Sequence, residues 1–134
     1  MKKRAKEEGC LWLEQAKADL HGATILFENQ IYHLVCFICQ QTAEKALKAY
    51  LYTQGEEIVT GHSVAALCDW AEKYERSFAK LKEDISLLDS FYIATRYPNG
   101  LPDSIPAKVF NRKPAEEALR MAKAAVVFVE NLLE

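Results

Sequence analysis

Residues 34–52 read LVCFICQQTAEKALKAYLY and contain neither Gly nor Pro. The first six of these residues are apolar, a pattern typical of a helix that is buried on all sides in the centre of a fold. In the second half, Gln41, Lys45 and Lys48 stand at positions i, i+4 and i+7, so they share a face of the helix. Glu44 precedes Lys48 by four residues, which is the favourable order for a helical ion pair. We therefore predict a central helix whose polar edge is either exposed to solvent or lines a site.

Further stretches of the chain carry apolar residues at three- and four-residue spacing, the period of an amphipathic helix. Together with the central stretch they predict helices over about residues 3–29, 32–54, 64–74, 77–95 and 114–133. Gly55 suits a left-handed cap at the end of the central helix, and Ser63 suits an N-cap for the next helix. The connection around Gln30 is so short that the first two helices must be antiparallel neighbours. Gly22 lies inside the first helix, where Gly costs about 1 kcal/mol relative to Ala, and is tolerable there if a neighbouring helix crosses close by.

One long irregular segment, residues 96–106, precedes the last predicted helix and holds three of the four Pro residues. Long loops in compact domains are usually functional or disordered. Tyr97, Leu101 and Ile105 give this one apolar side chains with which to pack, so we expect an ordered loop. The whole pattern predicts an all-α fold: an antiparallel up-and-down helical bundle of about five helices, forming a single domain over residues 1–134.

Composition narrows the classes of function. A net charge of -2 gives no global basic bias towards nucleic acid or an anionic membrane. Cys36 and Cys39 form a CxxC pair inside an apolar helix, with no second pair after it, which favours buried free thiols over metal or redox work. No stretch resembles a signal peptide or approaches the roughly 18 apolar residues of a membrane span. We therefore expect no metal site. We also expect a cytoplasmic protein, because free thiols suit a reducing compartment.

Two polar residues stand at positions that could serve a ligand. His62 comes directly before the predicted N-cap, where it either fixes the start of the helix or faces a site. Arg96 stands where a helix breaks into the Pro-rich loop, so it either interacts with the helix dipole or binds an anion with its planar fork. His21 and His33 fit surface or packing roles. Because no Gly-rich phosphate loop, Ser/His/Asp arrangement or acid–base pair is evident, the residues predict no cofactor and no catalytic group.

Three motifs in this order resemble the HEPN domain (higher eukaryotes and prokaryotes nucleotide-binding). They are Gln40-Gln41-x-Ala43-Glu44-Lys45-Ala46-Leu47-Lys48-Ala49, then Gly61-His62-Ser63, then Arg96-Tyr97-Pro98. The resemblance extends from Trp12 through the Ala-rich last helix, and residues 96–110 are also similar to the HEPN domain at the C-terminus of the sacsin chaperone.

This resemblance implies a helical bundle that often forms a homodimer and is often encoded beside a small nucleotidyltransferase, as in toxin–antitoxin pairs. Many family members are metal-independent ribonucleases, in which an Arg is followed four to six residues later by a His. The present chain departs from that pattern, because no His follows at that distance after any Arg, namely Arg4, Arg76, Arg96, Arg112 and Arg120. The departure argues against an enzyme and favours a nucleotide over RNA as the ligand.

Three hypotheses follow from the resemblance. The first is a dimeric module that binds a nucleotide or another phosphorylated ligand and acts with a nucleotidyltransferase partner. Its ligand-binding residues would be Gln41, Lys45, Lys48, His62, Arg96 and Tyr97. The second is a ribonuclease with a non-standard site that uses His62 and Arg96. The third is a dimerisation or interaction module that binds no small ligand.

Overall fold

The computed structural model describes residues 2–134, and within them the chain is helical and forms no β-strand. In chain order the elements are α1 (Lys2–Glu28), α2 (Tyr32–Thr53), α3 (Val64–Glu72), α4 (Phe78–Ile85), the 3₁₀ helix η1 (Ser86–Ser90), α5 (Phe91–Ala94), the 3₁₀ helix η2 (Pro98–Gly100), α6 (Pro106–Val109) and α7 (Arg112–Leu133). Among these residues, no helix combines the length and the apolar character needed to cross a membrane.

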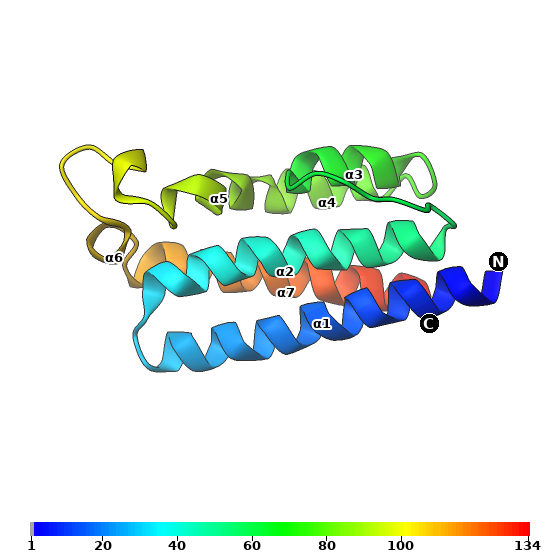
Figure 1. Ribbon diagram of the computed structural model, residues 1–134, viewed down its shortest axis with the longest axis horizontal. Helices are drawn as coiled ribbons and strands as arrows, with labels where there is room; N and C mark the ends of the chain where they lie inside the picture. Colours follow the sequence, from blue (N-terminus) through cyan, green and yellow to red (C-terminus); the bar gives the residue numbers. More distant parts are fainter. Residues whose placement is uncertain (1) are drawn as a thin grey trace.

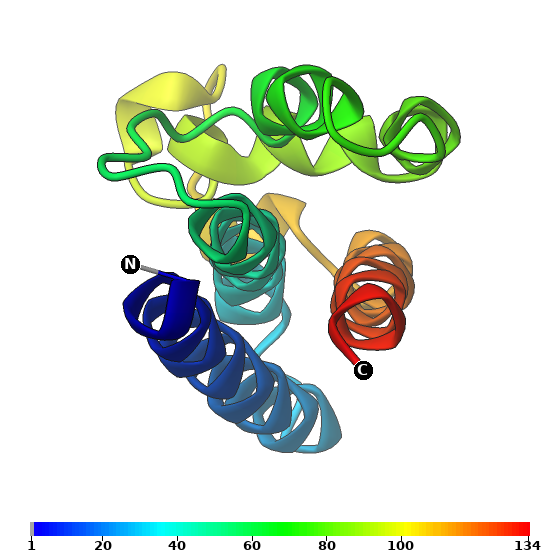
Figure 2. The ribbon, with the colours of Figure 1, turned by 90° about the vertical axis from the view of Figure 1, so that its right-hand side faces the viewer.

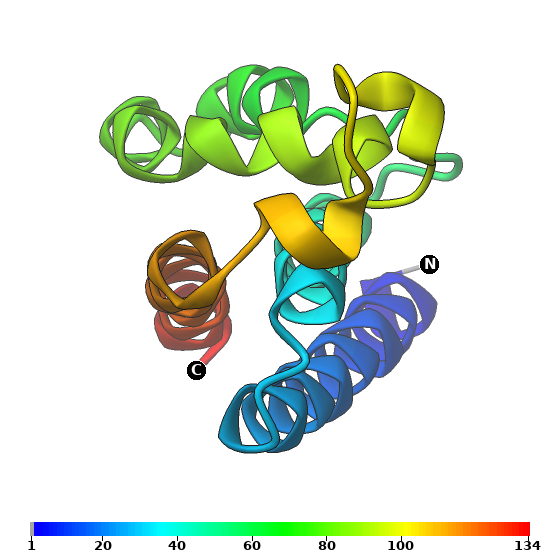
Figure 3. The same cartoon turned by 90° about the vertical axis from the view of Figure 1, so that its left-hand side faces the viewer.

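Helix α2 lies in the middle of the bundle (Figure 1) and contacts α1, α3, α5, α6 and α7. Seen along the long axis, α1 and α7 lie on either side of α2, and the layer formed by α3, α4 and α5 covers it (Figure 2). At the opposite end, α6 crosses the start of α2 before the chain enters α7 (Figure 3). Because α1, α2, α4–α5 and α7 alternate in direction along the chain, the predicted antiparallel up-and-down bundle is confirmed (Figure 1).

The core forms where the apolar stripes of the neighbouring helices meet α2. From residue 46 to residue 51 every position of α2 is buried, which is expected for a helix with neighbours on all sides. The face of α7 towards the core is rich in Ala, with Ala115, Ala118, Ala122 and Ala125 fully buried. Small side chains let two helix backbones approach closely, so this face brings α7 against α2.

The two predicted helix caps are present. Gly55 has a φ of 98°, and the backbone N–H groups of Gly55 and Glu56 donate to the carbonyls of Tyr52 and Leu51. This pair of bonds is a Schellman motif, which requires a left-handed residue and therefore favours Gly. At the start of α3, Ser63 Oγ accepts from the backbone N–H of Ala66 at 3.0 Å.

The boundaries differ from the prediction in two places. The helix expected over residues 77–95 is not continuous, because η1 separates α4 from α5. Ser86, Asp89 and Ser90 fall in this interruption, and Ser and Asp are weak helix formers whose side chains compete for backbone groups. The Pro-rich segment, expected as an irregular loop, contains the short helices η2 and α6, and α7 begins two residues before Pro114.

Candidate ligand-binding site

A buried carboxylate on α2 connects two of the predicted site residues. Glu44 Oε2 lies 3.0 Å from Lys48 Nζ, and Glu44 Oε1 lies 3.2 Å from His62 Nδ1. The side chains of Glu44 and Lys48 are only 7% and 8% exposed, whereas that of His62 is 57% exposed. The expected ion pair between Glu44 and Lys48 is therefore present, but it is part of the core rather than of a solvated edge. A buried carboxylate needs partners on both oxygens, and here each oxygen has one.

The backbone around His62 is held on both sides. Gly61 has a φ of 100°, a left-handed conformation that Gly adopts without strain. Gln40, which is fully buried, donates from Nε2 to the His62 carbonyl oxygen at 2.7 Å. Gln41 Nε2 in turn donates to Gln40 Oε1 at 2.6 Å. Gln41 is thus connected to the His62 backbone through Gln40, and its side-chain amide does not simply face solvent.

Asp89 from η1 anchors the residues that follow His62. Its two carboxylate oxygens accept the backbone N–H groups of Val64 at 2.6 Å and Ala65 at 3.0 Å, and the Ser63 hydroxyl donates to it at 2.9 Å. A negative charge at the start of a helix is favourable because unpaired N–H groups and the helix dipole meet there. The sequence contains no local signal for this contact, because Asp89 follows Val64 by 25 residues.

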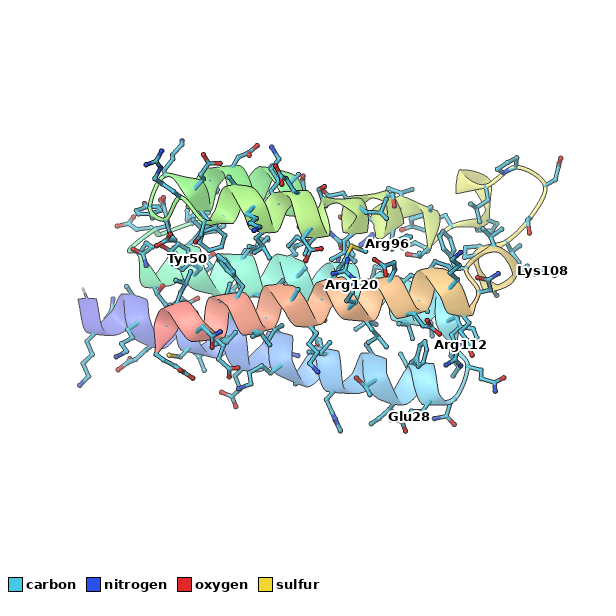
Figure 4. The ribbon with its side chains drawn as sticks, turned by 180° about the vertical axis from the view of Figure 1, so that it is seen from behind. Glu28, Tyr50, Arg96, Lys108, Arg112 and Arg120 are labelled. Carbon is cyan, nitrogen blue, oxygen red and sulfur yellow. The ribbon has the colours of Figure 1, made fainter. Side chains whose placement is uncertain are left out.

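The Arg96 guanidinium lies against two aromatic rings, and one of them also contacts His62. Its central carbon is 4.9 Å from the centre of the Phe37 ring and 4.5 Å from that of Tyr92. The His62 and Tyr92 rings are stacked, with centres 4.9 Å apart and planes inclined by 17°. Arg96 lies between the α4–α5 layer and α2, whereas Lys108 and Arg112 lie at the α6 end of the bundle (Figure 4). The structure therefore brings His62 and Arg96 to the same ring, Tyr92.

An open groove of about 590 Å³ lies beside Arg96, between the start of α2 and the Pro-rich segment. Its lining residues are His33, Leu34, Phe37, Thr95, Arg96, Tyr97, Pro98, Ile105, Pro106 and Ala107. No Asp or Glu of the described residues is among those that line the groove. Arg96 Nε is buried and has no hydrogen-bond partner among residues 2–134, while Tyr97 as a residue is 50% exposed. The groove is thus lined by cationic, aromatic and aliphatic groups.

Lys45 is separate from this arrangement. Its ammonium forms an ion pair with Asp19 of α1, so its charge is directed to the contact between α1 and α2. Helical spacing places Lys45 on the same face as Gln41 and Lys48. Because α2 is surrounded by other helices, however, side chains on that face can contact different neighbouring helices. Of the six predicted residues, the structure connects Gln41, Lys48 and His62 through Gln40 and Glu44, and it places Arg96 and Tyr97 at the groove.

The sequence did not single out Phe37, Tyr92 or Asp89, and His33 was assigned to the surface or to packing. Tyr92 precedes Arg96 by four residues, which is a readable signal for a contact on a helix. Phe37 and His33 join the groove only because the Pro-rich segment folds back over the start of α2.

The cysteines of the central helix are buried, as predicted. Burial raises the pKa of the Cys36 thiol to about 12 and raises that of Cys39 further, because the charged thiolate would lose its hydration. Burial also raises the pKa of Cys68 to about 12. Since the thiolate is the reactive form, these three thiols are poor nucleophiles in the folded protein. Cys10 is exposed.

Fold and site together define an all-α bundle domain with an aromatic and basic groove beside its central helix. A family model described as the HEPN domain matches residues 10–132, and the chain belongs to that family. The fold is similar to the crystal structure of TT1696 from Thermus thermophilus, with a TM-score of 0.83 and 37% identity over 92% of this chain and 96% of that one. It is also similar to ST0689, an archaeal HEPN homologue, with a TM-score of 0.77 and 28% identity over 94% of this chain and 98% of that one.

A curated relative carries a functional designation. The protein MJ1304 of Methanocaldococcus jannaschii, which is provisionally designated a toxin, is 24% identical over 132 residues. The match covers 92% of this chain and 87% of that protein.

Proposed function

We propose that the protein is a HEPN-type module that binds a nucleotide or another phosphorylated ligand in the groove beside Arg96. The observation that carries the proposal is the state of the Arg96 side chain. Its guanidinium lies against Phe37 and Tyr92, and its buried Nε has no hydrogen-bond partner among the described residues. A guanidinium remains charged in proteins, and its planar fork matches the geometry of phosphate oxygens. Aromatic contacts on its flat side hold such a group in place for binding.

The other lining residues suit the rest of a nucleotide. Tyr97, half exposed at the groove, offers a face on which a base can stack, an interaction that any base accepts. His33 adds a second group that can donate to an anion. The apolar side chains of Leu34 and Ile105 complete a lining of the mixed kind found in small-molecule sites, in which a few polar groups orient the ligand.

In the same proposal the protein is a homodimer in the cytoplasm that acts with a nucleotidyltransferase, in the manner of a toxin–antitoxin pair. Family membership supports dimerisation, and the provisional toxin designation of MJ1304 supports the paired context. Three exposed apolar residues that line the groove, Leu34, Tyr97 and Ile105, offer surface for a partner.

The test is calorimetric titration of ATP and GTP into the wild-type protein and two variants. Arg96→Gln removes the charge and the fork, so we expect the dissociation constant to rise about ten- to 150-fold, the range for a lost hydrogen bond to a charged group. Arg120→Gln is the matched control, because Arg120 pairs with Asp84 and Glu117 on an exposed surface, and we expect binding to stay within about twofold.

Circular dichroism must show that both variants remain folded. If the folded wild-type protein binds neither nucleotide at millimolar concentration, the nucleotide proposal fails and the interaction module without a ligand takes its place. Equal weakening by both variants would show that binding depends on net charge and not on the groove.

A ribonuclease is the second candidate, and one observation favours it. His62 Nδ1 contacts a carboxylate, and its ring contacts the same tyrosine as Arg96. A carboxylate that orients an imidazole is a common feature of general bases, and an arginine can stabilise charge that develops on phosphate. This arrangement would replace the absent Arg–His spacing.

Incubation with total RNA decides between the two candidates. If the protein is a ribonuclease, the wild-type protein should cleave RNA and His62→Ala should not. His21→Ala is the control and should still cleave, because His21 is exposed on α1 and does not line the groove. Intact RNA with the wild-type protein would remove the ribonuclease and leave the binding module.

A further inference from the structure

The contact between Glu44 and His62 determines which ring nitrogen of the imidazole carries the proton. His62 Nδ1 lies 3.2 Å from Glu44 Oε1. An ionised carboxylate only accepts hydrogen bonds, so Nδ1 must be the donor. In the neutral ring the other nitrogen, Nε2, then has a lone pair and accepts hydrogen bonds.

The surroundings hold the Glu44 carboxylate in place. Lys48 Nζ donates to Glu44 Oε2 at 3.0 Å, both side chains are almost fully buried, and both belong to one turn of α2. Two further contacts hold His62 independently of this pair: Gln40 binds its backbone carbonyl, and Tyr92 stacks on its ring. Glu44 cannot move away without disturbing the core, and the stacked Tyr92 ring holds the more exposed imidazole beside it.

The acceptor nitrogen adjoins the proposed site through Tyr92, although His62 does not itself line the groove. The His62 side chain is more than half exposed, and its ring contacts Tyr92, which also contacts the guanidinium of Arg96. A ligand whose phosphate binds Arg96 would therefore have to extend past the Tyr92 ring to reach His62. Because Nε2 accepts and does not donate, its natural partner is a hydroxyl group of the ligand and not a second phosphate oxygen.

We propose that Glu44, held by Lys48, is a positioning residue that fixes His62 in the Nδ1–H tautomer, so that Nε2 accepts a hydrogen bond from a ribose hydroxyl. The site then prefers ribonucleotides to 2′-deoxyribonucleotides, since the 2′-hydroxyl is the group by which proteins distinguish the two. This preference rests on the proposed nucleotide binding, whereas the tautomer is a property of the free protein.

The tautomer is measured first, without ligand, at pH 8. Long-range ¹H–¹⁵N correlation spectra distinguish a protonated ring nitrogen from an unprotonated one, and the His62 signals are assigned by their loss in His62→Gln. We expect the Nδ1–H form in the wild-type protein. In Glu44→Gln, Lys48 should attract the amide oxygen and turn the amide NH₂ towards Nδ1, so the proton should move to Nε2. Glu56→Gln is the matched control, because Glu56 accepts from Trp70 and Tyr74 away from His62, and it should leave the tautomer unchanged.

The ligand preference is measured next, by calorimetry with ATP against 2′-deoxy-ATP. One neutral hydrogen bond corresponds to about two- to tenfold in affinity, so we expect the wild-type protein and Glu56→Gln to prefer ATP by that factor. Glu44→Gln presents a donor in place of the acceptor and should lose the preference while it still binds through Arg96.

Each outcome bears on a different statement. An Nε2–H ring in the wild-type protein, or a tautomer that Glu44→Gln does not change, would overturn the role of Glu44 even if nucleotides bind. The expected tautomers with equal affinity for the two nucleotides would overturn the ribose preference alone. The expected tautomers without any nucleotide binding would overturn the proposed function and the preference together, and would leave the positioning of His62 established.

Discussion

Gly9→Ala should lower the free energy of unfolding by about 1–3 kcal/mol, although Ala is normally the better helix former by about 1 kcal/mol. Gly9 is buried where α1 crosses the end of α2. A methyl group at this position would overlap the Thr53 methyl and would lie 2.6 Å from the carbonyl oxygen of Ala49. A side chain such as Thr53 can rotate, but the Ala49 oxygen is backbone, so the two helices would have to separate.

Gly22→Ala is the matched control, on the same helix and with the same chemical change. An added methyl group at Gly22 would have no atom within 4 Å to overlap, so this variant should gain up to about 1 kcal/mol from helix propensity. Denaturant titrations followed by circular dichroism, compared at equal slope, give both values. If the two variants shift in the same direction, the close approach at Gly9 is wrong.

These two glycines show what a single sequence can and cannot predict about the fold. Apolar periodicity and cap residues are local, and they placed the long helices and the caps at Gly55 and Ser63 close to their observed positions. The spacing of two crossing helices is not local. Gly22 drew attention because Gly is unfavourable in a helix interior, but the close crossing is at Gly9, where the facing residues come from the far end of α2.

The contacts of the candidate site show the same difference between local and non-local information. The ion pair between Glu44 and Lys48 follows from their spacing on one helix, and it is present. The partner of Lys45 could not be predicted, because Asp19 comes from another helix whose rotation the spacing does not define. The same holds for Asp89, which contacts the start of α3. Asp89 belongs to η1, which interrupts the helix predicted over residues 77–95. Contacts within one helix were thus predictable, and contacts that depend on how two elements meet were not.

Lys48→Met should lower the free energy of unfolding by about 3 kcal/mol, which makes it one of the most damaging single changes in the chain. Methionine has nearly the same volume and length, so the change removes charge and leaves the packing almost intact. It also leaves the Glu44 carboxylate in the core with His62 as its remaining partner. Removing one member of a buried ion pair typically costs about 3–5 kcal/mol, and the contact with His62 places this case at the lower end.

Two further lysines make the comparison a graded series. Lys17 pairs with Glu130 at the surface, where the two side chains are 52% and 34% exposed, so Lys17→Met should have the smallest effect of the three. Lys45 pairs with Asp19 in partly buried surroundings, so Lys45→Met should fall between the other two variants. Denaturant titration measures all three on one scale.

The double variant Glu44→Gln/Lys48→Met separates the loss of the ion pair from the exposure of its surviving partner. If the cost of Lys48→Met comes from an uncompensated buried charge, then neutralising Glu44 as well should recover part of it, because replacing a whole buried pair by uncharged groups is often close to neutral. If it comes instead from the packing of the Lys48 stem, whose ammonium lies 5.7 Å from the centre of the Trp12 ring, the double variant should be at least as unstable as the single one. A cost for Lys48→Met no larger than that for Lys17→Met would contradict the burial of this pair, and with it the fixed carboxylate that positions His62.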